Sequence, residues 1–122
     1  MGVTVRGIRG ATTVDADEPA LIAEATEELL LELVRANDLA VDDIISIIFT
    51  VTPDLRSAYP AAGARRLGWL STPLLGATEM DVPGGLPRCI RVLMHVSIDR
   101  PPEAISHRYL RAAAGLRPDL AH

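Results

Sequence analysis

The sequence contains no lysine, no glutamine, a single cysteine and few aromatic residues. All 12 of its basic residues are therefore arginines, so any site that binds an anion must use guanidinium groups. The one cysteine, Cys89, leaves no partner for an internal disulfide, and a reducing cytoplasm is the expected location. We expect Cys89 itself to be a small core residue.

Long hydrophobic runs and a surplus of basic residues are also missing. The longest apolar run, around residues 44–51, is far shorter than the roughly 20 residues that a membrane span needs. No cationic, apolar leader of the signal-peptide type opens the chain. The net charge of -4, without a basic patch interleaved with aromatic residues, argues against a nucleic-acid surface. We therefore expect neither a membrane nor a nucleic acid as a partner.

The chain does have the length and the apolar content of one domain. We expect residues 1–122 to form a single domain, in which residues 117–122 are a flexible tail with few apolar anchors. Hydrophobic residues make up 48% of the sequence and mean hydropathy is +0.22, which is high for so short a soluble chain. Another copy of the chain should therefore cover part of the apolar surface, as in a homo-oligomer.

Apolar periodicity predicts strands and helices along the whole chain. Residues recur at helical spacing between Pro19 and Asn37, after a helix-start signal at Asp17. The other predicted elements are strands at 3–10, 44–52, 72–78, 89–98 and 107–110, a short helix at 60–67 and a helical segment at 111–115. This order indicates the α+β (mixed α/β) class, with a five-stranded mixed sheet and helices on one side.

Two arginines occupy strand positions where a cation needs a partner. In the strand at 89–98 every second residue is apolar and should be buried, whereas Arg91 lies on the opposite face. Arg9 closes an otherwise apolar face of the first strand, and Glu79 precedes the turn at 83–87 that leads into the strand of Arg91. Two interpretations stay open: an ion pair that holds strand ends together, or a site for a small anion.

Other chemistry finds little support in the residues. His95 and His107 lack cysteine, histidine or carboxylate partners at metal-ligand spacing, so we expect no metal site. The glycine-rich segment GGLPR lacks the lysine and the following serine or threonine of a phosphate-binding loop. The residues by themselves indicate a soluble α/β domain with a site for a small anion.

Four blocks of the sequence carry a more specific signal. They are RGIRGATT at 6–13, TPDL at 52–55, EMDVPGGLPRCIRV at 79–92 and LRPDL at 116–120. In this order and register, over nearly the whole chain, they resemble the trimeric bacterial chorismate mutases with the pseudo-α/β-barrel fold. The resemblance does not extend to the unrelated, all-helical chorismate mutases.

The resemblance implies a homotrimer whose sheets pack into a barrel-like core, with active sites in clefts between subunits. The implied reaction is the Claisen rearrangement of chorismate to prephenate, on the route to phenylalanine and tyrosine. Neither a metal nor an organic cofactor takes part in this family's reaction, and no covalent intermediate is expected. Chorismate is therefore the expected small-molecule partner.

The resemblance also implies roles for particular residues. Arg91 matches the cation beside the ether oxygen of the substrate, and Arg9 matches an arginine that binds a substrate carboxylate. Glu79 corresponds to the acid that accepts a hydrogen bond from the substrate hydroxyl. Tyr109 corresponds to a tyrosine near the side-chain carboxylate. From the residues alone, Tyr109 reads as an ordinary core or rim residue.

Further residues of the implied pocket come from two subunits. The resemblance implies that the residues just before the acid line the pocket, namely Leu75, Gly76, Ala77 and Thr78. At the mouth of the pocket it implies two residues from the adjacent subunit, Tyr59 and Arg65. Arg65 is expected to bind a carboxylate. Gly76, Ala62 and Tyr59 stand where a well-known relative has a cysteine, a lysine and a phenylalanine. These departures affect hydrogen bonding and charge near the mouth more than the chemistry.

Two alternatives belong to other functional classes. Trimeric imine or enamine deaminases share a similar architecture and also use an interfacial arginine for a carboxylate, but they need a positioned water molecule. A trimer that senses an aromatic-pathway acid without turning it over would keep the same cations. Turnover of chorismate separates the sensor from the enzyme.

Overall fold

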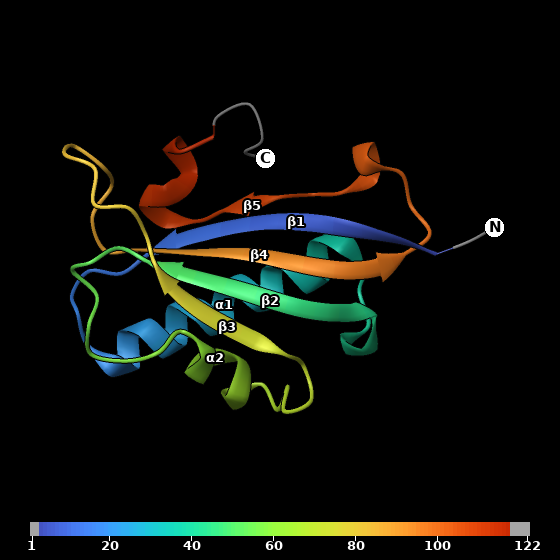
Figure 1. Ribbon diagram of the computed structural model, residues 1–122, viewed down its shortest axis with the longest axis horizontal. Helices are drawn as coiled ribbons and strands as arrows, with labels where there is room; N and C mark the ends of the chain where they lie inside the picture. The colour runs from blue at the N-terminus through green and yellow to red at the C-terminus, as the bar shows by residue number, and fades with distance from the viewer. Residues whose placement is uncertain (1–2, 118–122) are drawn as a thin grey trace.

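The computed structural model describes residues 3–117, and it contains each predicted strand and helix (Figure 1). The first strand runs on to Thr13 instead of ending at Gly10, and the segment at 111–115 is a 3-10 helix. The predicted flexible tail, apart from Arg117, lies outside the described residues. The elements are β1 (Thr4–Thr13), α1 (Pro19–Asn37), η1 (Val41–Asp43), β2 (Ile44–Val51), α2 (Ala61–Arg66), β3 (Leu74–Thr78), β4 (Cys89–Ile98), η2 (Pro102–Ala104), β5 (Arg108–Tyr109) and η3 (Arg111–Gly115).

The five strands form one mixed sheet, as predicted, in the order β3-β2-β4-β1-β5. The long strand β4 lies between β1 and β2 and runs antiparallel to both. The two outer pairs, β2 with β3 and β1 with β5, are parallel. The chain therefore runs from β1 through α1 to β2, and β1 and β2 are not neighbours in the sheet, because β4 lies between them.

Both α-helices cover the same face of the sheet (Figure 1). Leu29, Leu30 and Leu33 of α1 are fully buried against inward-facing strand residues such as Phe49 and Met94. This contact removes a large apolar area from water and is the main stabilising term of the fold. No helix within residues 3–117 is long and apolar enough to cross a bilayer.

The two helices approach each other closely where a small residue allows it. A Cβ atom on Gly63 of α2 would lie 2.7 Å from the Cβ of Thr26 on α1. Such a distance is far inside van der Waals contact, so α2 can dock here only with glycine. The start of α1 departs from the prediction. Asp17 does not cap the helix; its carboxylate accepts the backbone N–H groups of Arg56 and Ser57, both at 3.0 Å.

The opposite face of the sheet is largely open. The alternation predicted for β4 is confirmed, because its apolar positions from Ile90 to Ile98 are buried under the helices. The face of β1 that ends in Arg9, apolar in sequence apart from that arginine, is not covered in the single chain. Val5 on that face is 58% exposed, since the helices cover the Ile8 side instead.

One end of the open face has a cover of its own. The 3-10 helix η3 folds over it, and Ala113 packs there with Ala11 and Cys89. Cys89 is buried, as predicted for a small core residue, and its burial raises the pKa of the thiol. The group stays protonated and inert at neutral pH.

Candidate active site

Strand register places the two unusual arginines on the open face, on either side of a shared hollow. Arg91 on β4 lies opposite Ala11 of β1 and Thr50 of β2. Arg9 lies opposite Leu93, one step further along β4 on the same face. The hollow has a volume of about 300 Å³, and its lining includes Arg9, Ile48, Thr50, Arg91, Leu93, Tyr109 and Arg117. The sequence-predicted Arg9, Arg91 and Tyr109 thus come together in one cavity.

Glu79 reaches the side of this cavity from the end of β3. Its backbone N–H donates to the carbonyl of Val51 at 2.8 Å, which continues the β2–β3 pairing by one residue. Its Oε2 accepts a hydrogen bond from the Thr50 hydroxyl at 2.7 Å. The same oxygen lies 3.6 Å from Nε of Arg91. The carboxylate is therefore fixed at both its backbone and its side chain.

The Arg91–Glu79 contact bears on the two interpretations of the sequence. The ion pair exists, but 3.6 Å exceeds hydrogen-bonding distance. The Arg91 side chain is still 47% exposed, so its guanidinium has donors available to a ligand in the cavity. The ion-pair interpretation is therefore confirmed, and it is compatible with a site for an anion.

The short strand β5 carries Tyr109 and is held by contacts with α1 and β1. Asn37, buried at the end of α1, donates to the carbonyl of Ser106 at 2.8 Å and accepts from its N–H at 2.7 Å. The backbone N–H of Arg9 donates to Nδ1 of His107 at 2.9 Å. Arg108 forms an ion pair with a glutamate of α1. A two-residue strand is thus anchored well enough to fix the position of a functional side chain.

The anchor of Arg108 is Glu32 on α1, at 2.9 Å from its Nε. Arg35 also contacts Glu32, at 2.6 Å, one helical turn along α1. Hydrogen bonds from Arg35 and Arg108 lower the pKa of Glu32 from its ordinary value of 4.5 to about 2. The carboxylate that ties β5 to α1 is therefore ionised at neutral pH.

The TPDL block supports the start of β4. The Thr52 hydroxyl accepts the N–H of Cys89 at 2.9 Å and donates to Asp54 at 2.5 Å. The other oxygen of Asp54 accepts the N–H of Arg88 at 2.9 Å, where the backbone has a left-handed φ of 48°. These bonds hold a strained residue in place and set the direction of β4 just before Arg91.

The remaining predicted pocket residues lie elsewhere in the single chain. Tyr59 lines a second cavity, of about 470 Å³, together with Gly76, Ala77 and Thr78. Leu75 on β3 is 64% exposed. Arg65 is exposed on α2, on the helix side of the sheet. One chain therefore carries two separate groups of predicted site residues.

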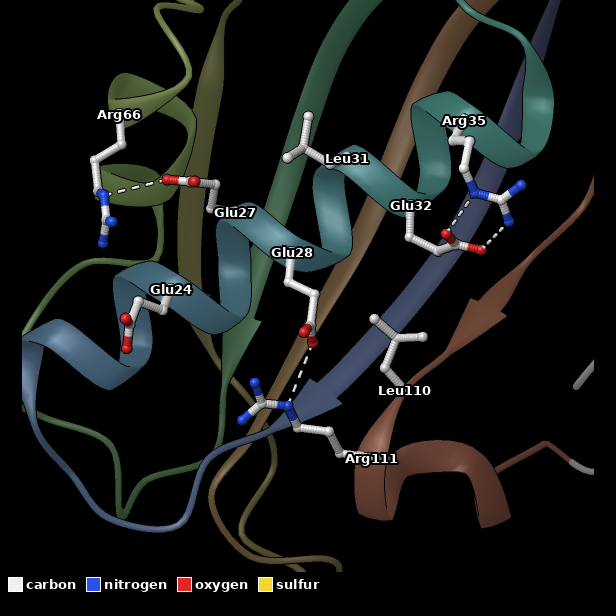
Figure 2. Close-up of a pocket in the computed structure, with 9 residues that line it drawn as sticks. All are labelled: Glu24, Glu27, Glu28, Leu31, Glu32, Arg35, Arg66, Leu110 and Arg111. Carbon is white, nitrogen blue, oxygen red and sulfur yellow. Dashed lines mark hydrogen bonds and ion pairs between the residues drawn. The ribbon is translucent and has the colours of Figure 1, made fainter.

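A larger groove runs along the outer side of α1 (Figure 2). Its volume is about 760 Å³, and its charged lining consists of Glu24, Glu27, Glu28, Glu32, Arg35, Arg66 and Arg111. Dashed lines in Figure 2 mark the contacts of Glu27 with Arg66 at 3.1 Å and of Glu28 with Arg111 at 3.3 Å. The four carboxylates outnumber the three guanidinium groups, so this groove disfavours an anionic ligand. Among residues 3–117, no three or more His, Cys, Asp or Glu side chains lie close enough together to hold a metal ion.

Sequence reasoning missed several residues that line the cavity of Arg9 and Arg91, among them Thr50, Ile48 and Arg117. Thr50 and Ile48 lie in an apolar β-branched run that reads as strand core, and nothing in the pattern distinguishes them. Arg117 was assigned to the tail, but it lines the same cavity. The LRPDL block that contains Arg117 is the signal that could have identified it.

The fold is that of an α/β protein with an arginine-lined cavity on one sheet face, and comparisons with known proteins identify its family. The family model for chorismate mutase type I matches residues 5–120. The chain is 52% identical to chorismate mutase AroH from Thermus thermophilus, over 95% of this chain and 96% of that protein. It is 43% identical to chorismate mutase AroH from Bacillus subtilis (strain 168), over 96% of this chain and 93% of that protein. The chain belongs to the chorismate mutase type I family, a family of isomerases.

A solved structure agrees with this assignment. The chorismate mutase from Clostridium thermocellum superposes with a TM-score of 0.87 at 52% sequence identity. The superposition covers 88% of this chain and 96% of that one. The five-stranded mixed sheet with helices on one side is thus the fold of a chorismate mutase.

Proposed function

We propose that this chain rearranges chorismate to prephenate in the cavity on the open sheet face, on the route to phenylalanine and tyrosine. The observation that carries the proposal is the convergence of Arg9, Arg91 and Tyr109 on one hollow, with Glu79 fixed beside Arg91. Chorismate offers two carboxylates, one hydroxyl and an ether oxygen. Several guanidinium groups and one carboxylate complement that set of groups.

In this reaction the ether carbon–oxygen bond breaks ahead of carbon–carbon bond formation. Negative charge therefore develops on the ether oxygen, and Arg91 is the group proposed to stabilise it. A fixed guanidinium in a water-poor cleft favours the dipolar transition state over the less polarised ground state. The rearrangement stays within one molecule and requires neither a covalent intermediate nor a cofactor.

The other residues hold the substrate in its compact, reactive conformer. Arg9 binds one carboxylate, Glu79 accepts a hydrogen bond from the substrate hydroxyl, and Tyr109 lies near the side-chain carboxylate. A million-fold acceleration needs roughly 8 kcal/mol of barrier lowering. One preorganised donor contributes about 3 to 4 kcal/mol, so restriction of the substrate conformation must supply much of the rest.

The proposed active form is a homotrimer with sites between subunits. In this arrangement the wall residues Leu75, Gly76, Ala77 and Thr78 and the mouth residues Tyr59 and Arg65 complete the pocket, with Tyr59 and Arg65 provided by a neighbour. Two features support it: the open sheet face exposes apolar side chains, and the predicted site residues are divided between two cavities of one chain. A site assembled from two subunits would unite them.

We also propose that residues 1–122 form one chorismate mutase domain that works in the cytoplasm. The family model spans residues 5–120, which supports a single domain. A single buried cysteine, without an internal disulfide, suits a reducing compartment.

The deciding experiment mixes purified, metal-free protein with chorismate, follows the loss of ultraviolet absorbance and identifies the product by NMR. Wild type should form prephenate. Arg91→Lys should lose at least about 100-fold in kcat although the charge is kept, because the planar fork of donors is lost. Arg35→Lys, on the exposed side of α1, is the matched control and should keep wild-type turnover.

Two results would contradict the proposal. Near wild-type turnover by Arg91→Lys would show that the ether-oxygen role belongs elsewhere. A folded wild-type protein that binds chorismate without turning it over would be the sensor considered above.

A further inference from the structure

We propose that Thr50 is a positioning residue for this rearrangement: its hydroxyl fixes one oxygen of Glu79 and thereby presents the other to the substrate hydroxyl. The inference rests on the proposed function. It adds a residue on β2 that neither the sequence pattern nor the family resemblance assigned to the reaction.

The geometry at Glu79 separates its two carboxylate oxygens. Oε2 accepts the Thr50 hydroxyl at 2.7 Å and lies 3.6 Å from Nε of Arg91. An ionised carboxylate only accepts hydrogen bonds, so Thr50 must be the donor. Within residues 3–117, Oε1 has no hydrogen-bond partner, and it is the oxygen that remains to accept the substrate hydroxyl.

Thr50 is well placed to hold this carboxylate still. It lies on a central strand, paired with Ala77 of β3 on one side and Arg91 of β4 on the other. Its β-branched side chain has few rotamers, so the hydroxyl keeps its direction. Thr50 also lines the cavity that contains Arg9 and Tyr109. The positioning group is therefore part of a rigid element and directly beside the substrate position.

Loss of the hydroxyl would change both partners of Glu79. The carboxylate could rotate toward Arg91 and form a closer pair with it. The guanidinium would then be partly diverted from the ether oxygen, and Oε1 would leave the position for the substrate hydroxyl. Since a hydrogen bond to a charged group is involved, kcat should fall about tenfold or more, with a smaller change in KM.

The test compares Thr50→Val, which keeps the shape and removes the hydroxyl, with Thr50→Ser, which keeps the hydroxyl. Thr50→Val should lose about tenfold in kcat, and Thr50→Ser should retain most of it. Thr12→Val is the control for a buried threonine on a strand: the Thr12 Oγ1 has no hydrogen-bond partner among residues 3–117, so activity should be unchanged. Circular dichroism and melting temperature check that each variant is folded.

A second pair of variants separates positioning from a structural role or a direct role. In a Glu79→Ala background, Thr50→Val should cause no further loss of kcat, because the group it positions is gone. A further tenfold loss there would overturn the inference, as would wild-type kinetics in Thr50→Val, or equal impairment of the serine and valine variants. Absence of prephenate formation by the wild type would instead overturn the proposed function itself.

Discussion

Arg91 keeps 47% of its side chain exposed although Glu79 lies beside it. A guanidinium surrounded by water stabilises a developing charge only weakly, because water screens the field. Its contribution to the reaction therefore depends on what excludes water from the cavity: the substrate, Arg117, which lines the cavity, and, in the proposed trimer, a neighbouring subunit. Arg91 is in position in the single chain, but its electrostatic effect on the substrate depends on how far these groups exclude water.

Arg9 has a different task, and its removal should have a different kinetic signature. A carboxylate clamp acts equally on the ground state and the transition state, so Arg9→Ala should raise KM by about 10- to 100-fold with little change in kcat. Steady-state kinetics with chorismate measure both constants. Arg35→Ala, which removes a guanidinium from the exposed side of α1, should leave both constants at wild-type values. A large fall in kcat with unchanged KM would contradict the clamp role.

The residue scale is also where sequence reasoning reached its limit. Alternation correctly placed Arg91 opposite the buried face of its strand, since the period of two is a local property. The same rule gave the faces of β1 but could not decide which one the helices cover. The Thr50–Glu79 bond joins positions 29 apart in the sequence, and no local pattern encodes such a contact.

At the scale of elements, α1 and β5 are fastened together by residues far apart in the chain. Glu32 of α1 contacts Arg108 of β5. Asn37, at the end of α1, contacts Ser106, which lies just before β5 in the chain. The existence and order of the helices and strands followed from periodicity, because apolar spacing reflects the covered side of each element, although β1 runs on to Thr13. Strand order could not be predicted from periodicity, since β4 lies between β1 and β2 in the sheet although it comes after both in the chain.

The Glu32 link makes a pH-dependent contribution to stability. The folded pKa of about 2 lies below the ordinary 4.5, so the contribution is complete above about pH 4.5 and disappears as pH falls toward 2. Glu32→Gln should destabilise the protein by about 1 kcal/mol at pH 7, as expected for a partly exposed pair. Urea unfolding of both proteins at several pH values measures the difference.

The difference in free energy of unfolding between wild type and Glu32→Gln should become smaller as pH falls from about 4.5 to 2. Glu24→Gln, on the same side of α1, is the control and should show no comparable narrowing. A constant difference across that range would mean that packing, rather than the charge of Glu32, accounts for the loss.

At the scale of the whole molecule, the single chain leaves one face of its sheet largely uncovered. The helices cover one face of the sheet, and the other exposes Val3, Val5 and Leu93 between its polar groups. An apolar sheet face of this kind is stable in water when another sheet covers it. Part of the exposed apolar surface therefore lies on the face that also carries Arg9 and Arg91.

A charge on this face should dissociate the proposed trimer without unfolding the chain. Val5 is 58% exposed in the single chain, so Val5→Glu removes little burial within one subunit, but in the proposed trimer it would bury an unpaired carboxylate. Sedimentation should give wild type three times the chain mass of 13.1 kDa and the variant a single chain mass. Activity should fall with the trimer, because the proposed pocket takes Tyr59 and Arg65 from a neighbour.

Leu31→Glu is the matched control for this experiment, because Leu31 is 48% exposed on the helix side of the sheet (Figure 2). It should remain trimeric and active. A monomeric, fully active wild type would contradict the shared site, and a trimeric Val5→Glu would mean that subunits meet through another surface. If Val5→Glu is monomeric and folded yet still turns over chorismate, the cavity of Arg9 and Arg91 is sufficient by itself, and the neighbour contributes stability rather than chemistry.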